Sequence, residues 1–265
     1  MALQLTTERL AQGVAELSRR DPHLAAVVAR HGVPPLWDRP PGFETLVQII
    51  LEQQISLSAG SAAYGRLERL AGAVTPERVA ALTDADLRGA GLTRQKSAYI
   101  RDIAQAIVAG EFDPNALADL DDDGARAALI KLRGVGAWTA DIYLLMALGR
   151  ADIWPSGDLA LVAAMREVKR MRSLPNSDRI GRVTNTWRPW RAVAARVLWH
   201  HYLSTPRSRV SGAKPSSRRM AVPSRRPVPK GRRSAARSPR PSRATAAGAS
   251  SKSGARTLRG GRTRA

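Results

Sequence analysis

The chain has 265 residues, of which 43% are hydrophobic, and its formal net charge is +21. This length and composition allow one substantial core or two small ones. No apolar run approaches the ~20 residues that a membrane-spanning helix needs, and the first residues are polar and amphipathic, unlike a secretory signal. The sequence therefore favours a soluble, cytoplasmic protein that needs no membrane.

Cysteine is absent from the chain. Its absence excludes disulfides and thiolate nucleophiles. It also excludes cysteine-bound zinc and four-cysteine iron–sulfur clusters.

The positive charge is concentrated at the C-terminus. Residues 205–265 hold 18 of the 43 Lys and Arg residues and no Asp or Glu, which leaves 25 basic and 22 acidic residues in residues 1–204. This segment is rich in Pro, Ser and Arg and poor in large apolar side chains, so we expect it to be disordered. Such a segment either binds DNA phosphates without sequence preference or is a solubilising appendage.

Residues 1–204 form the expected folded domain, and they predict helices because no sustained alternation of apolar and polar residues marks a strand. An apolar face at helical spacing from Phe43 to Leu51 follows two proline clusters. The other helices are expected over residues 7–19, 22–31, 57–70, 75–82, 95–108, 125–132, 137–148, 159–168, 178–183 and 189–203. About ten short helices with brief connections indicate an all-α domain.

A turn with two glycines separates two of these helices. An apolar face over residues 125–132 ends just before Gly134 and Gly136, and the next helix begins at once. The glycines permit positive φ and close backbone approach. The outward amide groups of the second helix would offer a site for a DNA phosphate, although an ordinary tight corner fits the same residues. The apolar run Ile142–Leu148 predicts that this second helix is buried.

Three segments in order resemble one family of DNA-repair enzymes. The hairpin Leu-Arg-Gly-Val-Gly-Ala-Trp-Thr-Ala, residues 43–63 and residues 187–202 are similar to DNA-3-methyladenine glycosylase II, the alkylation-repair branch of the helix-hairpin-helix DNA glycosylases. The likeness covers roughly residues 41–203. It implies a monomer that acts on double-stranded DNA containing alkylated bases such as 3-methyladenine and 7-methylguanine. Some members carry a β-rich domain ahead of the catalytic helices, whereas the residues before Phe43 here look helical.

Asp158 stands 20 positions after Trp138 and directly before an apolar helix. An Asp at such a place is most often an N-cap. The resemblance implies a second role, because the family places its essential carboxylate at this position. Loss of the base leaves oxocarbenium character on the sugar, and a fixed carboxylate stabilises that cation and orients or deprotonates the attacking water. Asp158 is therefore the candidate catalytic residue.

Trp138 occupies the position at which, by the same resemblance, the lyase branch of the superfamily carries a Schiff-base lysine. A tryptophan cannot form that adduct, so we expect hydrolysis that leaves an abasic site without a strand nick. The iron–sulfur cluster that is common in the lyase branch is excluded by the lack of cysteine. No cofactor is expected to be required, although the resemblance suggests a structural cation held by the backbone carbonyls of Leu132 and Val135.

The base pocket is predicted from aromatic residues. A base must leave the helix stack to be reached, and alkylated purines carry positive charge, so an electron-rich aromatic wall favours them by about 0.5–2 kcal/mol per contact. Trp138 and Trp199 are the main candidates. Tyr143 and Trp37 are further candidates, although packing in the core or at the surface fits each of them better. Trp199 lies off the expected core face of the last helix, which places it either in the pocket, as the resemblance implies, or against a neighbouring helix.

Candidate DNA-binding residues come from the hairpin and from the end of the helix that begins at Phe43. They are Gly134, Val135, Gly136, Thr139, Gln53, Gln54 and Ser56. In relatives, a residue near the end of this helix fills the gap left by the flipped nucleotide, and in some of them it is leucine. Here either Gln54 or Gln53 is expected to be this wedge residue. A buried polar side chain is costly, so Gln54 is expected to reach solvent or DNA.

Two other interpretations compete with an alkylation-repair glycosylase. A non-catalytic, chromosome-associated DNA-binding protein needs only the hairpin and the basic segment, and it has no use for Trp138, Asp158 and Trp199 together. A glycosylase for adenine mismatches or oxidised pyrimidines is disfavoured by the missing cysteines and lysine. The sequence therefore favours the alkylation-repair enzyme, associated with the nucleoid in the cytoplasm.

Overall fold

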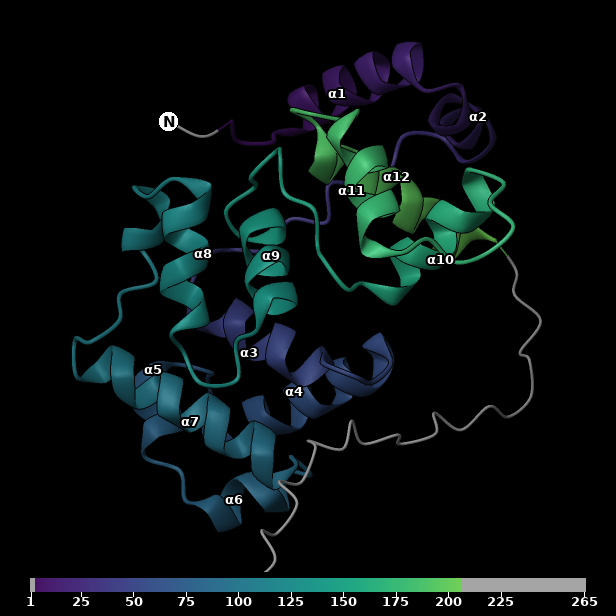
Figure 1. Ribbon diagram of the computed structural model, residues 1–265. Coiled ribbons are helices and arrows are strands. Elements are labelled where there is room, and N and C mark those ends of the chain that lie inside the picture. Colours follow the sequence, from purple (N-terminus) through teal and green to yellow (C-terminus); the bar gives the residue numbers. More distant parts are fainter. Residues whose placement is uncertain (1–2, 206–265) are drawn as a thin grey trace, which may run out of the picture. The chain divides into compact units, whose positions relative to one another are not determined.

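The computed structural model describes residues 3–205, which are helical (Figure 1). In chain order the helices are α1 (Thr7–Arg20), α2 (Pro22–His31), α3 (Phe43–Glu52), α4 (Leu57–Ala71), α5 (Pro76–Ala80), α6 (Asp84–Gly89), α7 (Arg94–Val108), the 3-10 helix η1 (Ala116–Ala118), α8 (Asp122–Ile130), α9 (Ala137–Met146), α10 (Leu159–Val168), α11 (Ser177–Asn185) and α12 (Arg191–Ser204). The predicted all-α class is confirmed.

Extended structure in the described part of the chain is limited to an isolated antiparallel bridge between Gln4 and Arg150. Within residues 3–205, no helix is long and apolar enough to span a bilayer. The expected disordered segment, residues 205–265, lies outside the described residues apart from Thr205.

The helices α3 to α7 form a group in which α3 packs against α4 and α7 and also contacts α9. α6 was not expected from the sequence, because six residues are too few to show apolar periodicity. Its start is defined instead by a capping box, in which Thr83 accepts the amide of Asp86 and the Asp86 carboxylate accepts the amide of Thr83.

The helices α8 and α9 lie side by side and are joined by the expected hairpin (Figure 1). α8 begins at Asp122, three residues before its expected start, because Asp121 caps it by accepting the amide of Gly124. α9 is buried from Thr139 to Leu145, as its apolar run predicted. The hairpin therefore projects from a helix that is fixed in the core.

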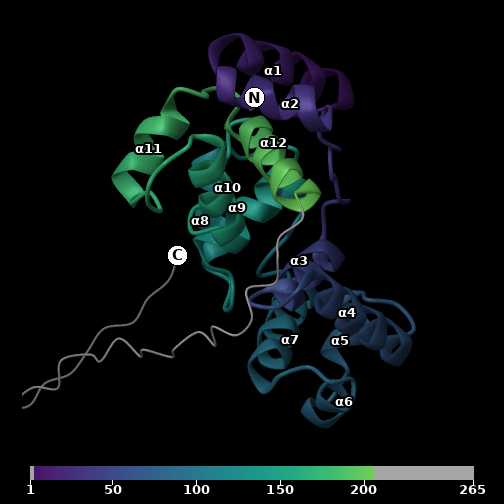
Figure 2. The ribbon, with the colours of Figure 1, turned by 90° about the vertical axis from the view of Figure 1, so that its right-hand side faces the viewer.

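The C-terminal helix α12 packs against α1, α2 and α10 (Figure 2). Every residue from Ala192 to Trp199 is buried, so the expectation of a single core face on this helix is wrong. A charged side chain, Arg196, is fully buried among them. Its guanidinium donates to the carbonyl oxygens of Leu36, Leu145 and Ala192, which satisfies the buried N–H groups. Burial lowers the pKa of Arg196 to about 10, so it remains charged at neutral pH.

Asp21 joins the N-terminal pair of helices to the end of α10. It caps α2 by accepting the amides of His23 and Leu24. Its Oδ2 accepts from Nζ of Lys169 at 2.5 Å and from the indole nitrogen of Trp187 at 2.7 Å. This buried carboxylate lies at the end of α10 opposite to Asp158.

Candidate active site

Asp158 is positioned by the turn that precedes α10. Gly157 has a φ of +83°, a conformation that favours glycine. Asp158 then caps α10, because its Oδ1 accepts the amide of Leu161 at 2.8 Å. The cap that the sequence suggested is therefore present, and the half-buried carboxylate remains open to further contacts.

Two indole nitrogens converge on the carboxylate of Asp158. The indole nitrogen of Trp138, in the first turn of α9, donates to Oδ2 at 3.0 Å. The indole nitrogen of Trp199, in α12, donates to Oδ1 at 3.4 Å. Residues far apart in the sequence thus meet at one acid, and the two tryptophans singled out in the sequence are both its partners.

The charge of Asp158 is held without a cationic partner among residues 3–205, since all its hydrogen-bond donors there are neutral. Neutral N–H donors fix the orientation of a carboxylate but leave its negative charge available to a developing cation. Trp138 is half-buried, whereas Trp199 is only 9% exposed. Trp138 therefore offers more aromatic surface to a ligand.

Leu159, the residue after Asp158, has a large apolar side chain that is exposed. It is 83% exposed, the highest value among the exposed large hydrophobic residues of the described chain. Leu159 does not stand out in the sequence, because an apolar residue at a helix start resembles ordinary core patterning. Its position at the first turn of α10 makes it a further candidate for contact with a ligand.

Tyr143 does not line a base pocket, which corrects the sequence prediction. The side chain is fully buried, and its hydroxyl accepts a hydrogen bond from the amide of Gly42 at 2.7 Å. Burial raises the pKa of this hydroxyl. The reason lies in the helix: five residues separate Tyr143 from Trp138, which turns it about 140° around α9.

The hairpin before α9 requires glycine at one of its two glycine positions. Gly134 has a φ of +89°, and a Cβ atom there would lie 2.3 Å from the side chain of Tyr99. Gly136 has a φ of −92° and no neighbouring atom within 4 Å of such a Cβ. Val135 and Thr139 are buried, so their side chains are not available for a contact with DNA. Only backbone groups of these two residues remain for such a contact.

The turn after α3 contacts the hairpin. Gln53 is half-buried, and its Nε2 donates to the carbonyl of Gly134 at 3.0 Å and to Oγ1 of Thr139 at 2.9 Å. Gln54 is exposed and has a φ of +59°. Ser56 caps α4 by accepting the amide of Ala59. Gln53 thus braces the hairpin, while Gln54 projects from the turn.

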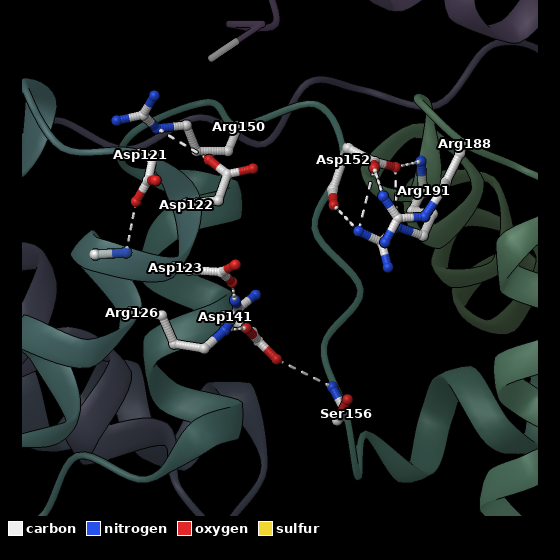
Figure 3. A network of polar contacts seen from close by, with 11 residues as sticks. Asp121, Asp122, Asp123, Arg126, Asp141, Arg150, Asp152, Ser156, Arg188 and Arg191 are labelled. Atoms are coloured by element: carbon white, nitrogen blue, oxygen red, sulfur yellow. Dashed lines mark hydrogen bonds and ion pairs between the residues drawn. The ribbon is translucent and has the colours of Figure 1, made fainter. Parts of the chain in front are cut away.

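A polar network supports the loop that leads to Asp158 (Figure 3). Asp141 of α9 is 3% exposed and accepts hydrogen bonds from Nε of Arg126 at 2.7 Å and from the amide of Ser156 at 3.3 Å. Further up the loop, Asp152 is held by Arg191 at 2.9 Å. Neither Asp141 nor Arg126 was singled out in the sequence, where the available signal was an acid within an apolar helix.

A hollow lies elsewhere on the chain. It has a volume of about 830 Å³ and is lined by Asp119, Asp121, Asp122, Asp123, Arg150 and several uncharged residues. None of its lining residues belongs to the cluster around Asp158. Its acidic lining disfavours a phosphate backbone, so it is a poor candidate for a nucleic-acid site.

Comparison with known proteins assigns the chain to a family with this architecture. The pattern described as HhH-GPD superfamily base excision DNA repair protein matches residues 47–189, which is more than half of the chain. The chain belongs to this superfamily. The resemblance to helix-hairpin-helix glycosylases drawn from the three sequence segments is confirmed.

Curated relatives carry related names. The DNA-3-methyladenine glycosylase of Bacillus subtilis is 33% identical over 123 residues, which cover 46% of this chain and 41% of the relative. The probable bifunctional transcriptional activator/DNA repair enzyme AlkA of Mycobacterium tuberculosis is 33% identical over 202 residues, 71% of this chain and 39% of the relative. The chain therefore spans about two fifths of the length of both relatives.

Solved structures show the same fold. The DNA-3-methyladenine glycosidase of Bacillus halodurans superposes with a TM-score of 0.64 at 27% identity, covering 77% of this chain and 93% of that one. The Schizosaccharomyces pombe 3-methyladenine DNA glycosylase Mag1, in complex with abasic DNA, has a TM-score of 0.64 at 22% identity and covers 72% and 95% of the two chains.

Proposed function

We propose that this chain is a monofunctional DNA glycosylase that excises alkylated bases of the 3-methyladenine and 7-methylguanine type from double-stranded DNA. The observation that carries the proposal is the carboxylate of Asp158, oriented by the indole nitrogens of Trp138 and Trp199. The names of the relatives support the alkylated base as substrate.

The reaction assigned to Asp158 is hydrolysis of the N-glycosidic bond. The bond between the sugar C1′ and the base nitrogen breaks, and its electron pair leaves with the base. The resulting cationic sugar is stabilised by the anionic carboxylate, which also orients a water molecule. The water oxygen bonds to C1′ and its proton passes to Asp158, so that an abasic sugar and a free base are formed.

Strand cleavage is not expected from this site. A lyase of the Schiff-base type needs an amine at the sugar, and position 138 holds a tryptophan whose N–H group is directed at Asp158. Lys96, a lysine near the hairpin, donates instead to the carbonyl oxygens of Leu51 and Gln53. Burial lowers the pKa of Lys96, but these contacts engage its amine within the fold.

Recognition of the flipped base is assigned to the surface beside the carboxylate. Trp138 offers an aromatic face that attracts a positively charged alkylated purine. Leu159, the residue after Asp158, adds exposed apolar surface. Trp199 contributes chiefly by holding Asp158, because little of its side chain is exposed.

DNA binding is assigned to the hairpin and to the turn after α3. The backbone amides around Gly136, at the start of α9, are suited to a phosphate. Gln54 is the wedge, because it is exposed where Gln53 is engaged with the hairpin. A cation on the carbonyls of Leu132 and Val135 remains a prediction; the Leu132 oxygen also accepts the amide of Val135 at 3.1 Å. We expect a monomer associated with the nucleoid.

Base-release profiling tests the proposed function. The protein is incubated with duplex DNA treated with a methylating agent, and the released bases are separated by chromatography. Release of 3-methyladenine or 7-methylguanine is expected. DNA binding without release of any base would contradict the proposal and favour a non-catalytic binding protein.

A further inference from the structure

Asp141 is a buried carboxylate in an otherwise apolar helix. It lies three residues after Trp138, so the two side chains leave α9 on neighbouring sides of one face. A carboxylate that is 3% exposed is costly unless its oxygens are bonded and its charge is balanced. The hydrogen-bond partners of Asp141 therefore indicate why a carboxylate is buried at this position.

Both oxygens of Asp141 are used, and for different purposes. Oδ1 accepts from Nε of Arg126 at 2.7 Å, and Arg126 also pairs with Asp123 at 2.9 Å. Oδ2 accepts the backbone amide of Ser156 at 3.3 Å. The ion pair balances the charge and fixes the side chain, while the second oxygen holds the loop two residues before Asp158 (Figure 3).

We propose that Asp141 is a positioning residue for the carboxylate of Asp158, an inference that rests on the proposed function. α9 then holds this segment at two points, because Trp138 binds Asp158 and Asp141 binds Ser156. Between these points lies Gly157, whose positive φ requires a residue with wide conformational freedom. Without the hydrogen bond between the Ser156 amide and Asp141, the turn before Asp158 is no longer held against α9 at this point.

The other ion pair on this loop acts further from the acid. Asp152 lies six residues before Asp158. It forms ion pairs with Arg191, the first residue of α12, and with Arg188 just before that helix. It fixes the entry of the loop, whereas Asp141 fixes its exit. The last turn before the acid therefore depends on Asp141.

The test compares Asp141→Ala and Asp141→Asn with a control variant, Asp21→Asn. Asp21 is a carboxylate of similar burial that also holds an ion pair and a cap, at the opposite end of α10. Single-turnover excision from methylated DNA and affinity for DNA with an abasic-site analogue are measured for each folded protein. Asp141→Asn has nearly the same shape as the native side chain, which keeps the test open if the alanine variant does not fold.

Asp141→Ala is expected to lower the single-turnover rate on the order of 10²-fold, the effect of a misplacement near 1 Å, with unchanged DNA affinity. Asp141→Asn loses less, because one oxygen remains to accept the Ser156 amide. Asp21→Asn keeps the wild-type rate. A wild-type rate in Asp141→Ala, or a loss that Asp21→Asn shares, overturns the proposal.

A second readout does not depend on activity. In a nitrogen-15 NMR spectrum, Asp141→Ala is expected to move the indole signals of Trp138 and Trp199, which bond to Asp158, whereas Asp21→Asn moves that of Trp187. Unmoved Trp138 and Trp199 signals in the Asp141 variants overturn the proposal. If the wild-type protein releases no base, the proposed function fails, and these signals still decide whether Asp141 positions the acid.

Discussion

The indole nitrogen of Trp138 donates to Oδ2 of Asp158 across 3.0 Å, joining the first turn of α9 to the N-cap of α10. The indole N–H group of Trp138 therefore orients the carboxylate of Asp158. An acid that is held by neutral donors keeps its charge for the substrate, which is what stabilisation of a cationic sugar requires.

Replacement of the two indoles by phenyl rings separates orientation from stacking. Trp138→Phe keeps an aromatic face but removes the donor to Asp158, and a hydrogen bond to a charged group contributes about 1.5–3 kcal/mol. We expect the excision rate to fall about tenfold or more. Trp199→Phe removes a longer bond, of 3.4 Å, and should cost less. Equal rates for wild type and Trp138→Phe in single-turnover assays would show that the indole N–H group has no role.

The product of the reaction should be an intact strand with an abasic site. A denaturing gel of the treated DNA is expected to show cleavage only after alkali or heat, and borohydride should trap no covalent complex with the protein. The reason is that a tryptophan at position 138 supplies no amine to the sugar. A trapped complex would contradict this and would indicate an amine elsewhere, such as that of Lys96 or of Lys131, which follows α8 just before the hairpin.

The two hairpin glycines should differ in their tolerance of the same substitution. Gly134→Ser forces a side chain into a positive φ and against Tyr99, so we expect a loss of about 2 kcal/mol or more in the free energy of unfolding. Gly136→Ser meets open space at a φ of −92°, and serine is a good N-cap for α9. Denaturant unfolding should therefore give a stability close to wild type for Gly136→Ser. Equal losses at both positions would show that the geometry around Tyr99 is not the cause.

Asp21 should make part of the stability sensitive to acid. Burial raises its pKa, but the hydrogen bonds from Lys169 and Trp187 outweigh burial, and the net pKa lies below the ordinary value of 3.8. The stabilisation is thus fully present above pH 3.8 and is lost as the pH falls through the lowered pKa. We expect the stability difference between wild type and Asp21→Asn to narrow in that acid range. A difference that stays constant with pH would contradict this account.

The parts of the fold that were predictable depend on local signals. The glycines of the hairpin and the apolar run of α9 are contiguous in sequence, and both appear where they were expected. The burial of α12 was underestimated because the helices that surround it come from distant segments of the sequence. A charged residue in its middle, Arg196, also indicated an exposed face, although it is buried.

The candidate site was predictable where a motif marked it, and it was not predictable where long-range contacts form it. Asp158 and Trp138 belong to the segment that resembles the family. The role of Gln53 depends on a contact with Gly134, 81 residues away, and that of Asp141 on an amide 15 residues away. Tyr143 was wrongly placed because an aromatic residue on α9 reaches the site or the core according to its angle around the helix, which requires the packing of that helix to be known.

Asp158→Asn tests the central claim most directly. Asparagine caps a helix about as well as aspartate, so the variant should fold and bind DNA like the wild type. It lacks the negative charge, and we predict that single-turnover release of 7-methylguanine from methylated duplex DNA falls by at least about 10²-fold. A folded Asp158→Asn protein that binds DNA and still releases the base at a near wild-type rate would contradict the assignment of Asp158 as the catalytic carboxylate.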